Sequence, residues 1–207
     1  MLQIHTFPLG QMLSNCYLVV DSQSNQTLII DPGDEADFIV RKIKDLELTP
    51  LKIIATHGHF DHIMAVYELQ LAYSIPFAVH KEDEFLVGSL KASARHFLNM
   101  EAIKPVIDEY LTDGDVLKIG ENKLTVIHTP GHTPGSVCLF SQKDKILFTG
   151  DLLFADGAVG RTDFSYSSPS DLEKSLAKIF QLDPQISIYP GHGTTSIIQR
   201  EQALHTL

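Results

Sequence analysis

The sequence predicts an α/β protein in which mixed β-sheets are covered by helices. Short runs rich in β-branched and aromatic residues occur in groups in both halves of the 207-residue chain. Segments with the apolar spacing of amphipathic helices lie between and after these groups, an order typical of sheets covered by helices. No Pro/Gly/Ser-rich linker interrupts the chain, so we expect residues 1–207 to form a single domain.

The first half of the chain predicts strands that alternate with helices. Two β-rich runs flank the polar turn DSQSNQ, and the apolar run LKIIAT predicts a buried strand. Phe38, Ile39 and Ile43 have helical spacing after acidic first-turn residues. We therefore expect strands at 16–20, 27–33, 51–56 and 76–80, and helices at 34–46, at 62–73 and over most of 82–100.

The second half predicts a further group of strands that is followed by helices. Turn residues separate four β-rich runs, and SPSDLEK is typical of a helix start. We expect strands at 116–120, 123–129, 136–141 and 145–150, a helix at about 169–181, a last strand and turn within ISIYPGHG (186–193), and a closing helix at 194–204.

The composition excludes several classes of partner. Asp and Glu outnumber Lys and Arg by 26 to 16, and a net charge of −10 is a poor match for a nucleic acid. No apolar run approaches the roughly 18 residues that span a bilayer, and the N-terminus has no export signal. Cys16 and Cys138 stand in predicted strands, without the spacing of a disulfide framework. We expect a cytoplasmic protein with two buried thiols and neither nucleic-acid nor membrane partners; the sequence does not specify its oligomeric state.

Histidines and aspartates stand where four of the predicted strands give way to loops. In open α/β folds, ligands and catalytic groups collect at such strand ends. Neighbouring glycines such as Gly58 and Gly191 let the backbone turn tightly beside them. The residues concerned are His57, His59, Asp61 and His62 after the strand at 51–56, His132 after 123–129, Asp151 after 145–150, and His192 after the last strand.

These residue types predict a metal centre. Imidazole nitrogen and carboxylate oxygen are ligands that zinc, iron(II) and manganese accept. Residues two apart in extended chain point the same way, so His57 and His59 can share one ion while Asp61 and His62 face a second. Seven ligands exceed the four of a structural zinc site, and two ions bridged by Asp151 would use them all. We expect the other histidines to be surface or core residues with satisfied hydrogen bonds: His5, His80, His96, His128 and His205.

The segments THGHFDH, HTPGHTPGS, FTGDLLF, VGRTDFS and YPGHG together resemble the metallo-β-lactamase superfamily, and within it the glyoxalase II-like hydrolases. The resemblance implies an αββα sandwich of two mixed sheets flanked by helices, here without the C-terminal helical glutathione-binding domain of larger members. It also implies two divalent ions, with zinc favoured over iron or manganese. The implied ligands are His57, His59 and His132 for the first ion, Asp61, His62 and His192 for the second, and Asp151 as the bridge.

The resemblance further implies hydrolysis of S-lactoylglutathione-like thioesters, small molecules that a metal-bound hydroxide attacks. Asp61 and Asp151 would act as catalytic residues, with Asp61 orienting the hydroxide and taking its proton. Arg161 falls at about the position of the family's substrate-binding lysine, so we expect it to bind substrate, for example through a carboxylate. A purely structural bond from Arg161 to Asp163 is the alternative.

Three other functions stay open at this point. A persulfide dioxygenase of the same superfamily would use a single non-haem iron held by His57, His132 and Asp151. A lactonase would use the same two-metal chemistry on a cyclic ester. A non-enzymatic metal-binding module would explain the ligands, but not an open, glycine-lined strand edge.

Overall fold

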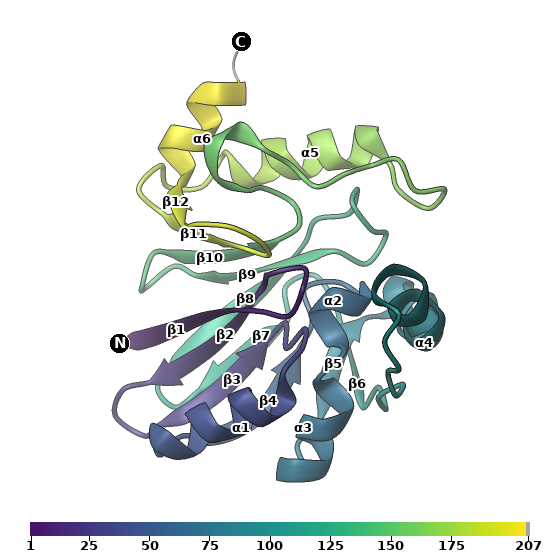
Figure 1. The fold of residues 1–207 in the computed structure, drawn as a ribbon. Coiled ribbons are helices and arrows are strands. Elements are labelled where there is room, and N and C mark those ends of the chain that lie inside the picture. The colour runs from purple at the N-terminus through teal and green to yellow at the C-terminus, as the bar shows by residue number, and fades with distance from the viewer. Residues whose placement is uncertain (206–207) are drawn as a thin grey trace.

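Two six-stranded sheets lie face to face in the computed structural model, which describes residues 1–205 (Figure 1). Each sheet follows the order of the chain, β1 to β6 in the first and β7 to β12 in the second. The first sheet comprises β1 (Leu2–Leu9), β2 (Ser14–Asp21), β3 (Gln26–Ile30), β4 (Thr49–Ile54), β5 (Phe77–His80) and β6 (Glu109–Leu111). The second comprises β7 (Val116–Ile119), β8 (Asn122–His128), β9 (Val137–Ser141), β10 (Ile146–Gly150), β11 (Ser187–Pro190) and β12 (Ser196–Ile197).

Helices cover the outer faces of both sheets. Apolar side chains of four helices pack against the first sheet: α1 (Ala36–Asp45), α2 (Phe60–Ile63), α3 (Val66–Tyr73) and α4 (Glu84–Leu98). Those of α5 (Pro169–Ile179) and α6 (Ile198–His205) pack against the second, on the opposite side of the molecule (Figure 1). The expected αββα sandwich is therefore confirmed.

The layer between the sheets is a continuous apolar core. Tyr17 and Ile30 of the first sheet meet Val126 and Phe148 of the second, and the rings of Tyr17 and Phe148 lie 5.0 Å apart, edge to face. All eight residues of β2 are buried because this strand is covered on both faces. The core fixes how the two sheets face each other, and with them the loops at their edges.

Strand directions bring the site-bearing loops to one edge of the sandwich. In the first sheet β3 to β6 run parallel, and in the second β10 runs parallel to β11. Two links join the sheets there: Val137 donates its backbone N–H to the Thr56 carbonyl at 2.8 Å, and Ser14 forms an isolated bridge with His192. The ends of β4, β10 and β11 therefore converge.

Several elements differ from the sequence-based prediction. β1 and β6 were not predicted. The expected helix at 62–73 is two helices, because the N–H of Ala65 donates to the Pro32 carbonyl instead of continuing the helical ladder. The closing helix begins only at Ile198, since Ser196 and Ile197 pair with β11 as β12.

Cys16 and Cys138 are buried and unpaired, as expected. Within residues 1–205, no helix is both long and apolar enough to cross a membrane.

Candidate metal centre

The loop after β4 carries four of the predicted ligands and is held by two buried aspartates. Asp31, at the end of β3, accepts hydrogen bonds from the backbone N–H and the hydroxyl of Thr56, both at 2.6 Å. Asp83 accepts one from the N–H of Gly58 at 2.7 Å. The loop then enters α2, whose first turn presents Asp61 and His62. The backbone of HGHFDH is thus fixed independently of any bound ion.

His57, His59 and His132 form the first group of potential ligands. His59 Nδ1 lies 3.1 Å from His57 Nε2 and 2.9 Å from His132 Nε2. His132 stands in the loop between β8 and β9, and its Nδ1 is 2.8 Å from the Arg161 carbonyl oxygen. His59 Nε2, on the far side of its ring, is 2.9 Å from the hydroxyl of Tyr166. Three imidazole nitrogens therefore converge on one point.

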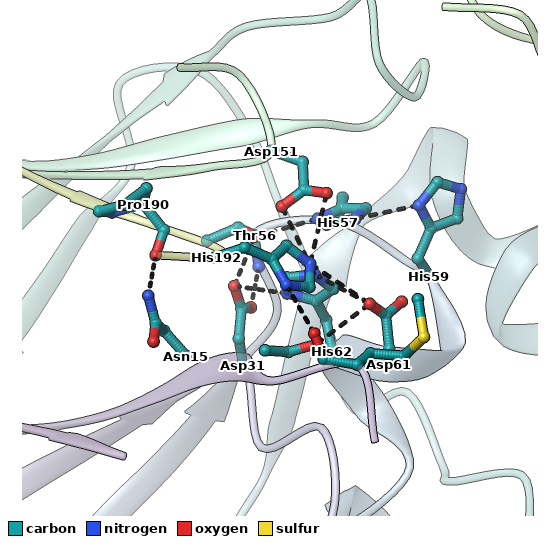
Figure 2. A network of polar contacts seen from close by, with 12 residues as sticks. Asn15, Asp31, Thr56, His57, His59, Asp61, His62, Asp151, Pro190 and His192 are labelled. Carbon is teal, nitrogen blue, oxygen red and sulfur yellow. Dashed lines mark hydrogen bonds and ion pairs between the residues drawn. The ribbon is translucent and has the colours of Figure 1, made fainter. Parts of the chain in front are cut away.

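Asp61, His62 and His192 form the second group (Figure 2). His192 Nε2 lies 3.3 Å from His62 Nε2 and 3.4 Å from Asp61 Oδ2. On the outer side, His62 Nδ1 is 3.1 Å from Asp31 Oδ2, and His192 Nδ1 is 3.2 Å from the Met12 carbonyl oxygen. This group draws together a helix of the first half and a loop of the second.

Asp151 lies between the two groups, directly after β10. Its Oδ2 is 3.6 Å from His132 Nε2 in the first group. Its Oδ1 is 3.5 Å from His62 Nε2 in the second, and Figure 2 shows this contact. Oδ1 is buried yet has no hydrogen-bond partner. A buried carboxylate oxygen without a partner is costly unless a cation fills the gap.

The arrangement fits a pair of divalent cations. Outer hydrogen bonds to Nδ1 of His62, His132 and His192 leave each Nε2 lone pair directed inward, an orientation typical of metal ligands. Lone pairs at such separations repel unless a proton or a cation lies between them. The nitrogen–nitrogen distances of 2.9–3.3 Å are close to the edges of about 3.3–3.4 Å expected for tetrahedral zinc with bonds of about 2.0–2.1 Å. The structure thus brings together all seven predicted side chains; their role as ligands stays a prediction.

Burial and neighbouring charges set the protonation of these groups. Burial and nearby imidazole rings lower the pKa of His59 to about 3 and hold the pKa of His57 well below its usual value. Burial also disfavours a charge on His62, but the carboxylates of Asp61 and Asp151 outweigh it and raise the pKa of His62 to about 10. His57 and His59 are therefore neutral, the form that binds metals, whereas His62 would release a proton on binding one.

A cavity of about 320 Å³ opens beside the centre. Arg161 lines it, as a substrate-binding residue would, but its Nε and Nη2 each donate a hydrogen bond to Asp163 at 2.6 Å. Its guanidinium also lies 4.4 Å from the centre of the Phe164 ring. A larger hollow of about 660 Å³ over β7 to β9 contains none of the predicted ligands.

Sequence reasoning missed Asp31, Asp83 and Tyr166. Asp31 directly follows β3 as Asp151 follows β10, but the strand predicted at 27–33 placed Asp31 inside the strand and so hid it. Asp83 accepts hydrogen bonds from Gly58, Thr133 and Gly135, each at 2.7 Å, and ties the two loops that carry the first group. No local pattern indicates that connection.

The remaining histidines lie outside the centre. His80 and His128 stack with ring centres 4.2 Å apart, and with Glu82 they form a further cluster of possible ligand atoms. One nitrogen of each ring has a hydrogen-bond partner: His80 Nδ1 accepts from the Glu82 N–H, and His128 Nε2 is 2.9 Å from the Pro134 carbonyl oxygen. These two bonds agree with a structural role for the pair.

The fold and the centre define a class of protein that comparison with known families identifies. The family model of the metallo-beta-lactamase superfamily matches residues 9–192. The chain therefore belongs to this superfamily, whose members include metal-dependent hydrolases.

Individual relatives carry several different names. Hydroxyacylglutathione hydrolase GloC of Haemophilus influenzae is 34% identical over 206 residues, which cover 97% of this chain and 95% of GloC. The crystal structure of BLEG-1, a B3 metallo-β-lactamase, is 33% identical and superimposes with a TM-score of 0.89 over 97% of each chain. The di-iron-bound form of TTHA1623 is 34% identical, with a TM-score of 0.87 over 96% of each chain. ETHE1 from Myxococcus xanthus is 25% identical, with a TM-score of 0.80 over 99% of this chain and 83% of ETHE1.

Proposed function

We propose that this protein is a dinuclear metallohydrolase that cleaves small-molecule thioesters of the S-lactoylglutathione type. The observation that carries the proposal is the position of Asp151, which reaches both ligand groups and has a buried oxygen without a partner. The likeness to GloC supports the thioester as substrate.

Two divalent ions bound there would supply an acidified water molecule and would polarise the thioester carbonyl. The side chains of the protein hold and orient the reactants. Ser14 donates its hydroxyl hydrogen to Asp61 Oδ2 at 3.0 Å, which leaves Asp61 Oδ1 free to accept a proton from water. Hydrolysis adds water across the C–S bond and gives a carboxylate, a thiol and a proton, so no oxidant is required.

Oxidation of a persulfide is the second candidate. The likeness to ETHE1 from Myxococcus xanthus, at 25% identity, supports it. Its ligand set here would be His57, His132 and Asp151, with one iron and dioxygen as co-substrate. Lactones and, given the likeness to BLEG-1, β-lactams belong in the same assays.

Metal analysis of anaerobically purified protein, combined with turnover assays, separates these functions. Two ions per chain with release of thiol from a thioester would support the hydrolase. One iron per chain with uptake of dioxygen would overturn it in favour of the dioxygenase. A fully metal-loaded protein without turnover of any thioester, lactone, β-lactam or persulfide would leave a metal-binding module.

A further inference from the structure

We infer that the cavity beside the metal centre selects neutral thioesters with an apolar chain over thioesters of a charged thiol such as glutathione. The inference rests on the proposed hydrolysis of thioesters at the same site, and within that reaction it replaces the lactoyl group and the glutathione of the reference substrate by an apolar acyl chain and a neutral thiol. It concerns the cavity lined by one face of α4 and by the aromatic residues of the 164–166 loop, here called the α4 cavity.

One face of α4 forms the first wall of the α4 cavity. Leu86, Ser89, Ser93 and Phe97 follow one another at intervals of three, four and four residues, so they lie on the same side of the helix. The hydroxyl of Ser89 donates to the Leu86 carbonyl at 2.9 Å and is turned toward the helix backbone. The two small serines leave space between the larger apolar side chains at either end. The wall is therefore shaped for a chain rather than for a compact polar group.

Aromatic rings form the other walls. Phe164 and Tyr166 stack with ring centres 5.2 Å apart, and Phe60 stacks on Phe97 at 5.3 Å. Phe97 is 55% exposed and Met12, also at the rim, is 45% exposed. Large apolar side chains left in water beside a catalytic centre indicate a surface that an apolar ligand covers.

Charge complementarity points the same way. Apart from histidines, Arg161 is the only cationic residue among those lining the α4 cavity, and both of its hydrogen bonds go to Asp163. Glutathione carries two carboxylates and one ammonium group, and the single cation here, Arg161, already has its charge offset by Asp163. By contrast, each CH₂ group of an apolar chain that is buried in the cavity makes the free energy of binding more favourable by about 0.8 kcal/mol, which corresponds to about fourfold in affinity.

The test compares kcat/KM for the acetyl, butanoyl and hexanoyl thioesters of N-acetylcysteamine, a small neutral thiol, and for hexanoyl-glutathione. We expect kcat/KM to rise at least tenfold from acetyl to hexanoyl, and hexanoyl-glutathione to react no faster than its neutral counterpart. Equal rates along the acyl series, or a clear preference for the glutathione thioester, would overturn the inference.

Two single-residue variants of α4 test whether the α4 cavity causes the preference for longer acyl chains. Phe97→Ala, a change at an exposed residue, should lower the hexanoyl-to-acetyl ratio of kcat/KM several-fold. Lys91→Ala, on the same helix but outside the cavity lining, should keep the wild-type ratio. An unchanged ratio in Phe97→Ala would also contradict the inference.

A binding measurement separates failure of the inference from failure of the proposed function. If no thioester is hydrolysed, the proposed function fails, and calorimetric titration of the metal-loaded protein with ethanethiol and hexanethiol still tests the cavity. Binding of hexanethiol at least tenfold tighter than ethanethiol would uphold apolar selection. Equal affinities would overturn it.

Discussion

Asp151 is the single residue through which the two ligand groups meet. Asp151→Asn removes a negative charge that offsets two dications, so we expect metal to be lost from both positions. His192→Ala should lower occupancy mainly in the second group, to which His192 belongs. Metal ions counted per chain by mass spectrometry check both outcomes.

His96→Ala provides the control, because His96 is an exposed histidine of α4 outside the metal centre. It should bind as much metal as the wild type. Equal metal content in wild type and Asp151→Asn would rule out the bridge.

The pairing of Arg161 with Asp163 changes what we expect of Arg161 as a substrate-binding residue. Because two hydrogen bonds to Asp163 offset the charge of its guanidinium, we expect Arg161→Ala to act through the loss of packing on Phe164. The variant should then lower kcat/KM by similar factors for a carboxylate-bearing and a neutral thioester. A loss confined to the carboxylate-bearing substrate, seen as a raised KM, would instead support the anchoring role.

The positions of the seven predicted ligands follow from the sequence because each stands at a strand end, and strand ends meet at one edge. Residues that act through distant contacts have no such signal. Asp83 is 50 residues from Thr133, its partner in the second ligand loop, and the pairing of Arg161 with Asp163 was only one of two alternatives before the structure was known. The local sequence pattern therefore predicts which side chains lie together in the metal centre, but not the distant hydrogen bonds that hold their loops in place.

At the scale of elements, the turn after β11 must pass very close to the ligands. A Cβ on Gly191 would lie 2.2 Å from Asp151 Oδ1 and 2.9 Å from His62 Cε1. Gly191→Ala should therefore displace ligands of the second group and reduce the metal content of the purified protein.

Gly88→Ala is the matched control for this change. Nothing lies within 4 Å of a Cβ added at Gly88, in the middle of α4. Alanine there should keep the metal content and stabilise the protein by about 0.5–1 kcal/mol, measured by denaturant unfolding. Normal metal content in Gly191→Ala would show that the turn adapts.

Asp83 joins the loops after β4 and β8 through three buried hydrogen bonds. Its removal in Asp83→Ala leaves buried donors without partners, and each such bond to a charged group contributes about 1.5–3 kcal/mol. We expect a lower melting temperature in the metal-free protein and weaker metal binding by the first group. Asp45→Ala, a change at an exposed residue at the end of α1, should alter neither; a normal melting temperature in Asp83→Ala would contradict the role.

The elements that sequence reasoning missed are short or locally ambiguous. β6 has only three residues and depends on pairing with β5. The break between α2 and α3 depends on the Pro32 carbonyl, 33 positions before Ala65 in the chain. β2 and β10 were easier to predict because both of their faces are buried, so each contains an unbroken apolar run, CYLVV in β2 and ILF in β10.

At the scale of the whole molecule, Asn15 fastens the first sheet to the loop of His192. Its side-chain nitrogen donates to the carbonyl oxygens of Pro190 and Gly193, each at 2.9 Å, and its backbone N–H donates to Gly191. Asn15→Ala leaves two carbonyl groups without these donors, so we expect a loss of about 1–3 kcal/mol of stability.

The second ligand group should lose metal more readily than the first in Asn15→Ala, as chelator titration would show. Gln23→Ala, a change at an exposed residue of the turn after β2, serves as the control. Identical stability in the two variants would show that the hydrogen bonds of Asn15 do not stabilise the packing of the two sheets.

The consecutive order of strands in each sheet bears on how the protein acquires its metal. Either sheet can assemble from neighbours along the chain, without waiting for the other. The first half of the chain supplies His57, His59, Asp61 and His62, and the second supplies His132, Asp151 and His192. A complete binding site therefore exists only after the two halves have docked, and the uptake of metal during refolding should report the last step of folding rather than the first.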